Sequence, residues 1–401
     1  MAKRTFPDRL FRRLGILIGL GGITMIANKT ALAQAAAPPQ DAGPRQYWAY
    51  IGNTSNDGIA LFKLDSDAGT LTSQGIAAPA NGSGFLAIAP NQKLLYAAVT
   101  MDTPAGRAGG VEGFSIDATT GKLSPINTER SEKGAAAFVM VEPSGRDVLA
   151  AHYAQATVAV LPIDADGRLS PVSCTIQESG SSVDPVRQTH AYAHSVNCDP
   201  AGNFAISCDL GADKLFIYKF DAALGKLTPN DPRSVSVPPG SGPRHLTFSR
   251  DGKFVYQINE MGATVIVYSF DAATGALTQI QSVKTLKNDE KGNTSAEVQI
   301  DPSGRFLYAS NRLTTNYLTI FSIDPASGKL KLAGYQDSLG KTPRNFRIDP
   351  TGRYLLLANQ DSDTLVLFSI DAQTGLLSPV GQPIPTVHGP ICVKFVAVQD
   401  H

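Results

Sequence analysis

Histidine, arginine and glutamate recur at equivalent positions of a repeated segment in the second half of the chain. Each copy is an apolar stretch, a turn of the Pro/Asp-x-Gly type and a second apolar stretch. With the copies aligned on the Pro position, the residues six and five before it are His194-Ser195, Arg244-His245, Ala296-Glu297 and Arg344-Asn345. Arginine binds carboxylates and phosphates, and His and Glu can transfer protons. This pattern indicates acid–base chemistry on an anionic ligand.

The second apolar stretch of each copy returns to the same region, where it adds further charged side chains. Ten residues after the Pro position lie Glu260 and Arg312, and Arg187 stands just upstream of His194. We therefore expect one site to gather Arg187, His194, Arg244, His245, Glu260, Glu297, Arg312 and Arg344. A structural alternative is that Arg–Glu pairs only brace one another, because desolvated charges must be paired. However, the arginines outnumber the carboxylates, which leaves positive charge for an anion.

Other chemistry-bearing motifs are absent from the sequence. It has no Gly-x-Ser-x-Gly elbow, Walker loop or dinucleotide fingerprint, and no Cys-x-x-Cys or His-x-x-x-His pair. These motifs typify serine hydrolases, nucleotide sites and zinc sites. We therefore expect no metal and no cofactor. The four cysteines are too few for a disulfide framework in a chain of this length, and we expect free thiols.

Two recurring elements indicate the fold that must position these side chains. An apolar strand ending in Asp, a short Gly turn and Leu occurs seven times, with the aspartates at Asp65, Asp117, Asp164, Asp221, Asp271, Asp324 and Asp371. The hairpin segment described above occurs six times. Periods near 50 residues with about four short strands each are typical of β-propeller blades. The sequence predicts an all-β, seven-bladed β-propeller.

The ends of the chain account for the missing seventh hairpin. Residues 391–398 resemble the first half of a hairpin without its second half, and residues 47–52 resemble a second half without its first. We expect the N- and C-terminal strands to pair and close one blade. An open solenoid, the rival architecture, would not need such complementary ends.

The N-terminus has the pattern of a targeting segment. Five basic residues precede an apolar run and the small residues of Ala31-Leu32-Ala33, which predicts a signal peptide over 1–33 cleaved after Ala33. The alternative is an uncleaved anchor, and Arg12-Arg13 leaves a Tat route open. We expect a flexible tail over 34–45, the propeller over 46–399, and a periplasmic or secreted location.

Composition narrows the choice of partners. The chain carries 35 Lys+Arg and 35 Asp+Glu, so it lacks the basic excess that drives nucleic-acid binding. No segment beyond the N-terminus is long and apolar enough to span a membrane. We therefore expect a monomer that binds a small molecule, with neither nucleic acid nor a membrane as partner.

Four segments carry a resemblance to a known family. They are RQTHAYAHSVNCDPAGNF, GSGPRHLTFSRDGKFVYQINE, NTSAEVQIDPSGRFLYASNR and TPRNFRIDPTGRYLLLANQ. They resemble the propeller-type 6-phosphogluconolactonases, a family that includes the fungal carboxy-cis,cis-muconate cyclases. The resemblance extends over nearly the whole chain from Tyr47 to Val398. One departure is Tyr192, where the family often has the first histidine of a His-Ala-His triplet.

The resemblance implies hydrolysis of a small anionic lactone, either 6-phosphogluconolactone or an unphosphorylated aldonolactone. It assigns catalysis to His194, Arg244 and Glu260, with His194 or Glu260 as the base and Arg244 at the carbonyl oxygen. Substrate binding would fall to Arg187, His245, Glu297, Arg312 and Arg344. Two alternatives stay open: a carboxymuconate cyclase, and a non-catalytic exported propeller that binds an anionic ligand.

Overall fold

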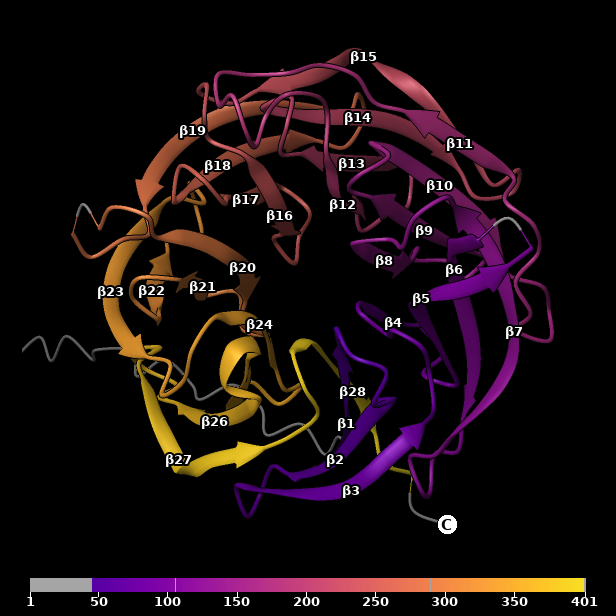
Figure 1. Ribbon diagram of the computed structural model, residues 1–401. Helices are drawn as coiled ribbons and strands as arrows, with labels where there is room; N and C mark the ends of the chain where they lie inside the picture. The colour runs from indigo at the N-terminus through magenta and orange to yellow at the C-terminus, as the bar shows by residue number, and fades with distance from the viewer. Residues whose placement is uncertain (1–44, 105, 289, 400–401) are drawn as a thin grey trace, which may run out of the picture. The chain divides into compact units, whose positions relative to one another are not determined.

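The strands from Gln46 onward form seven four-stranded antiparallel sheets around a central axis (Figure 1). The structure is a computed structural model that describes residues 45–104, 106–288 and 290–399. The predicted signal peptide and nearly all of the predicted tail lie outside these residues. The seven-bladed, all-β prediction is confirmed.

Each sheet runs outward from an inner strand that faces the axis. From inner to outer strand, six sheets are β4 (Leu86–Ile88), β5 (Leu94–Thr103), β6 (Gly106–Ile116), β7 (Leu123–Glu132); β8 (Phe138–Val141), β9 (Asp147–His152), β10 (Thr157–Pro162), β11 (Cys174–Gln177); β12 (Ala193–Cys198), β13 (Phe204–Asp209), β14 (Lys214–Asp221), β15 (Lys226–Ser236); β16 (Pro243–Phe248), β17 (Phe254–Asn259), β18 (Thr264–Asp271), β19 (Ala276–Lys284); β20 (Thr294–Ile300), β21 (Phe306–Arg312), β22 (Tyr317–Ile323), β23 (Leu330–Asp337); and β24 (Pro343–Ile348), β25 (Tyr354–Asn359), β26 (Thr364–Ile370), β27 (Leu377–Pro385). The only helical element in the described residues is a 3₁₀ turn, Gln360–Ser362.

The seventh blade is built from both ends of the chain, as predicted. Its inner strand is β28 (Pro390–Ala397), followed outward by β1 (Gln46–Asn53), β2 (Ile59–Asp65) and β3 (Thr70–Ala78). β28 and β1 pair antiparallel along their length, from Tyr47 opposite Ala397 to Ile51 opposite Val393. This pairing closes the ring.

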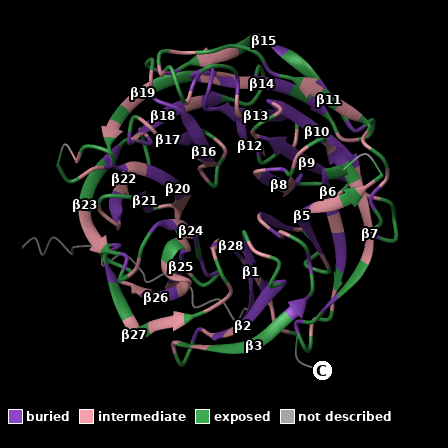
Figure 2. Ribbon diagram, in the orientation of Figure 1, coloured by how far each residue is buried: buried purple, intermediate pink, exposed green. Residues whose placement is uncertain are grey.

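The hydrophobic core lies between neighbouring blades, where each sheet packs against the next. The three inner strands of each blade are largely buried, and exposed residues concentrate on the outermost strands (Figure 2). Because a single blade would leave both faces of its sheet in water, the blades stabilise one another.

The recurring Asp–Gly turn joins each blade to the blade before it. The Tyr256 hydroxyl of β17 donates to the Gly328 carbonyl of the next blade at 2.9 Å. Equivalent bonds run from Tyr50 to Gly121, Tyr96 to Gly167 and Tyr308 to Gly375. Gly328 has φ +68°, and a Cβ there would lie 2.5 Å from the Phe254 ring. Only glycine allows both this backbone conformation and this close approach.

β-Bulges interrupt three inner strands at predicted site residues. In β12 the pairing passes from Ala193 to Ser195 while the partner strand advances one residue, so His194 is the extra residue. The register shifts in the same way at Arg244 in β16 and at Arg344 in β24. A bulge changes the direction of a side chain relative to a regular strand and is frequent beside active sites. Two consecutive residues of one inner strand can therefore both point toward the axis.

The four cysteines are unpaired, as predicted; Cys174 is half-buried and the other three are buried. Within the described ranges, no helix has the length and apolar character needed to cross a membrane.

Candidate active site

Glu260 is the centre of a buried ion-pair cluster at one end of the central axis. Its Oε2 accepts hydrogen bonds from Arg244 Nε at 2.9 Å and Arg312 Nη2 at 3.0 Å, and its Oε1 accepts one from Arg187 Nη2 at 2.7 Å. Glu260 directly follows β17, and its backbone bonds to Gly242 and Ser295 hold it in place. Four residues that the sequence analysis singled out thus lie in direct contact.

The loop between β11 and β12 supplies Arg187 from outside the inner strands. The Asp184 carboxylate accepts hydrogen bonds from the backbone N–H groups of Val186 and Arg187. The Gln188 side chain ties the same loop to the Leu210 carbonyl. Arg187 is partly exposed, whereas Arg244 and Arg312 are buried. It therefore closes the cluster on the solvent side.

The arginines determine the charge state of Glu260. Burial alone would raise the pKa of its carboxyl group, but Arg312 and Arg244 outweigh that effect and hold the pKa well below its ordinary value. Glu260 is therefore a permanent carboxylate of low basicity. Between the two candidate bases, this environment disfavours Glu260 and leaves His194.

His194 lies beside this carboxylate without a hydrogen bond to it. Its Nε2 is 3.9 Å from Glu260 Oε2, and within the described part of the chain neither ring nitrogen has a hydrogen-bond partner. Burial lowers the pKa of His194 well below its usual range, and the positive charge of Arg244 lowers it further. The imidazole is thus neutral at neutral pH and can accept a proton.

Arg344 is the least neutralised arginine of the cluster. Its Nη1 lies 3.3 Å from Gln360 Oε1, and in the described residues it forms no ion pair with a carboxylate. The set of Arg187, Arg244, Arg312 and Arg344 faces a single carboxylate, Glu260. This end of the axis carries a net positive charge suited to an anionic ligand.

Aromatic side chains form a wall next to His194. The Tyr153 ring stacks on Tyr192 at 4.6 Å and contacts His194 edge-on at 5.5 Å. His190 packs on the outer side of Tyr192 at 4.1 Å. Tyr192, the departure from the family pattern, thus contributes a ring to the wall, and His190 remains exposed at its edge.

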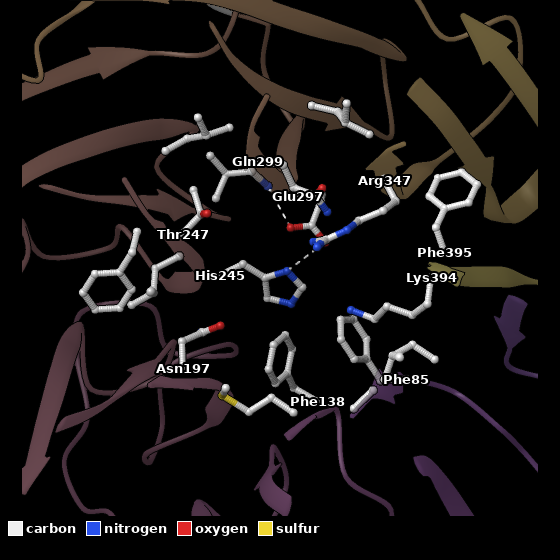
Figure 3. Close-up of a pocket in the computed structure, with 18 of the residues that line it drawn as sticks. Phe85, Phe138, Asn197, His245, Thr247, Glu297, Gln299, Arg347, Lys394 and Phe395 are labelled. Atoms are coloured by element: carbon white, nitrogen blue, oxygen red, sulfur yellow. Dashed lines mark hydrogen bonds and ion pairs between the residues drawn. The ribbon is translucent and has the colours of Figure 1, made fainter. Parts of the chain in front are cut away.

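His245 and Glu297 belong to a second level, deeper along the axis. His245 Nδ1 lies 3.2 Å from Glu297 Oε2, which also accepts a hydrogen bond from the Asn345 side chain. Burial raises the pKa of Glu297 to about 7, although Arg244 opposes this shift. Both side chains line a central channel of about 680 Å³, shown in Figure 3. They are close to the cluster around Glu260 but face a different space.

The sequence analysis missed two cations in this channel, Arg347 and Lys394. Alternation along a strand would have found them, because residues two apart share a face. Arg347 is two residues beyond Asn345, and Lys394 lies on the closing strand β28. No three His, Cys, Asp or Glu side chains of the described residues converge as a metal site would require.

Comparison with known proteins identifies the family. The family model described as "Lactonase, 7-bladed beta-propeller" matches residues 48–395. The chain belongs to this lactonase family. Its lactonase relatives include the 6-phosphogluconolactonase of Bacillus subtilis, 30% identical over 88% of this chain and 99% of that protein. The 6-phosphogluconolactonase of Formosa agariphila is 31% identical over 82% of this chain and 92% of that protein.

Among solved structures, this lactonase-family chain is similar to the periplasmic gluconolactonase of Pseudomonas aeruginosa. The two share 32% sequence identity with a TM-score of 0.81, over 88% of this chain and all of the other. The resemblance noted in the sequence is thus confirmed at the level of the family.

Proposed function

We propose that this protein hydrolyses a sugar lactone at the mouth of the propeller where Glu260 lies. The observation that carries the proposal is the pairing of a neutral, buried His194 with a carboxylate that three arginines hold ionised. The names of the family's relatives support the lactone as substrate class. Lactones are activated esters, so a base, an oxyanion donor and a binding group suffice for hydrolysis.

In the proposed reaction, His194 Nε2 removes a proton from water as the water oxygen attacks the lactone carbonyl. Arg244 Nη2 stabilises the resulting oxyanion, since its Nε is committed to Glu260 and its Nη1 to the Ala296 carbonyl. Collapse of the tetrahedral intermediate breaks the ring C–O bond, and the imidazolium returns its proton to the leaving alkoxide. The Glu260 carboxylate stabilises the imidazolium between these two steps.

Arg344, Arg312 and Arg187 would hold the anionic group of the substrate. The excess of positive charge favours a phosphorylated lactone, because a phosphate pairs well with arginine. An unphosphorylated gluconolactone is the second candidate, since the similar periplasmic protein of Pseudomonas aeruginosa carries the name gluconolactonase. His245 and Glu297 would support the floor of the site through the contact of His245 with Arg244.

Export of the protein belongs to the same proposal. The basic and apolar pattern of residues 1–33, with cleavage after Ala33, would direct the chain to the periplasm or the medium. Fractionation of cells, followed by N-terminal sequencing of the mature protein, tests this point. A mature N-terminus at Gln34 is expected, and an intact Met1 in the cytosolic fraction would contradict it.

The decisive experiment is a hydrolysis panel on the purified protein. It compares 6-phosphogluconolactone, gluconolactone and a carboxymuconolactone, with spontaneous hydrolysis subtracted. We expect turnover of a sugar lactone. Turnover of the carboxymuconolactone alone would instead favour the cyclase alternative, and no turnover of any would favour a binding protein.

A further inference from the structure

The central channel holds two cations that the proposed reaction does not use. Arg347 on β24 and Lys394 on β28 both point into the space beside His245 (Figure 3). Neither forms an ion pair with a carboxylate of the described residues. Protein surrounds Arg347 on all sides, yet its side chain is accessible to water because it projects into the channel. These are charges held in place without a fixed counter-ion.

The acidic groups of the channel do not neutralise them. Glu297 accepts hydrogen bonds from the Asn345 side chain and the Val298 backbone, and burial raises its pKa to about 7. Asp301, at the outer end, accepts bonds from the backbone of its own turn. Burial lowers the pKa of Lys394, which is the cost of a cation without a partner. An anion in the channel would relieve that cost.

The inner end of the channel is apolar. The rings of Phe85 and Phe138 lie 4.4 Å apart, and the Lys394 ammonium lies 4.9 Å from the centre of the Phe85 ring. Asn197 and Thr247 add polar groups to the wall (Figure 3). The channel thus offers two cations, an aromatic surface and a few neutral polar groups, the usual composition of a small-molecule site.

The channel is separate from the mouth that contains Glu260. The His245 ring packs edge-on against Phe85, Phe138 and His194, at 5.8, 5.3 and 5.2 Å. These rings form a plug between the two spaces. The channel lining continues away from the plug along the inner strands to Pro302 and Pro350, which lie in the strand-connecting turns of the opposite end. A ligand would therefore enter from the face opposite the proposed catalytic mouth.

We propose that this channel is a second ligand site, which binds a small organic dicarboxylate with its acidic groups on Arg347 and Lys394 and its apolar body against Phe85 and Phe138. The volume of about 680 Å³ is within the range of small-molecule pockets. The site does not depend on the lactone reaction. A bound anion would nevertheless lie next to His245, whose ring contacts both His194 and Arg244.

Calorimetric titration of the full protein with phthalate and succinate, at constant ionic strength and with acetate as the monoanion control, tests this site. We expect both dicarboxylates to bind more tightly than acetate, and phthalate more tightly than succinate because of its ring. Arg347→Gln and Lys394→Met should each weaken binding by about tenfold or more, as loss of a charged hydrogen bond does. Lys331→Gln, which removes an exposed cation of β23, should leave binding within about twofold.

Arg344→Gln separates the two ends of the axis. Dicarboxylate binding that survives this variant supports the channel, whereas loss of binding would place the ligand in the mouth and overturn the proposal. Absence of binding to the wild-type protein would also overturn it. Because either channel variant could fold poorly, the crystal structure of the wild-type protein with phthalate provides an independent measurement, and an empty channel beside an occupied mouth would contradict the proposal.

Discussion

His194 Nε2 lies 3.9 Å from Glu260 Oε2, beyond hydrogen-bond distance, while two arginines bind that same carboxylate oxygen at 2.9 and 3.0 Å. Glu260 therefore does not orient the histidine as the aspartate of a catalytic triad does. Its negative charge is instead fixed close to a ring that would become positive only during the reaction. This relationship gives His194 and Glu260 different roles, which substitutions can distinguish.

His194→Asn should lower kcat by about 10²- to 10⁴-fold, the usual contribution of a general base, with little change in KM. Initial rates on the sugar lactone that the protein turns over best measure this effect. His190→Asn is the matched control, because His190 is exposed at the edge of the aromatic wall. Equal activity of the two variants would remove His194 from the mechanism.

Glu260→Gln should destabilise the protein far more than Arg187→Gln. The first variant leaves Arg244 and Arg312 buried without a carboxylate, which costs about 3–5 kcal/mol. The second breaks a pair whose arginine is partly exposed, worth up to about 1 kcal/mol. Urea denaturation of both variants measures the difference in free energy of unfolding. Similar losses would mean that the cluster is not held by Glu260.

Arg344→Gln should raise KM for a phosphorylated lactone by about tenfold or more, because a charged hydrogen bond to the substrate is lost. KM for the unphosphorylated lactone should change by less than about threefold, since its hydroxyl groups do not need a cation. The comparison of the two substrates on one variant is internally controlled. An equal rise in both KM values would show that Arg344 does not recognise the phosphate.

Acid should destabilise the protein partly through His152. Burial lowers the pKa of this histidine from its ordinary 6.5 to about 4, and its Nε2 lies 2.9 Å from the Ser131 hydroxyl. The unfolded chain therefore binds a proton that the folded chain refuses, and stability falls as pH drops from about 6.5 to about 4. The loss attributable to this group is about 3 kcal/mol.

His152→Gln should make the pH dependence of the unfolding free energy shallower by about one proton across that window. Denaturation at several pH values measures the slope. His388→Gln is the control, because a hydrogen bond to Asp57 raises the pKa of this exposed histidine and its effect has the opposite sign. An unchanged slope in His152→Gln would contradict the prediction.

Gly328→Ala should destabilise the protein more than Tyr256→Phe, although both act on the same junction between blades. Tyr256→Phe removes one buried hydrogen bond, worth about 1 kcal/mol. Gly328→Ala forces a side chain into positive φ and against Phe254, each of which costs energy. Thermal melts of the two variants should rank them in this order, and the reverse order would mean that the turn can shift without cost.

The fold could be predicted because its signals are local and repeated. Each Asp–Gly turn marks one blade, and the unmatched half-hairpins at residues 47–52 and 391–398 predict the closing pair that β1 and β28 form. What the repeats could not indicate is the reason for the turn glycines. The contact of Gly328 with Phe254 joins two blades and depends on packing that no single repeat contains.

The candidate site could be predicted only in part. Alignment of the repeats brings His194, Arg244, Glu260 and Arg312 to one end of the axis, where the structure places them. Strict alternation in a strand would have sent Arg244 and His245 to opposite faces, and only the bulge at Arg244 explains how both point toward the axis. The division into two spaces depends on the packing of the His245 ring, which the sequence pattern does not reveal.

The closing strand also imposes an order of events on synthesis. β28 is made last, yet it is the innermost strand of the blade to which the first strands belong. Until it emerges from the ribosome or an export pore, the inner edge of β1 has no partner, and an unpaired edge invites pairing with other chains. Closure joins segments from nearly opposite ends of the sequence, a slow type of contact. Completion of translation is therefore a checkpoint for the ring, and the strand that passes it also delivers Lys394 to the channel.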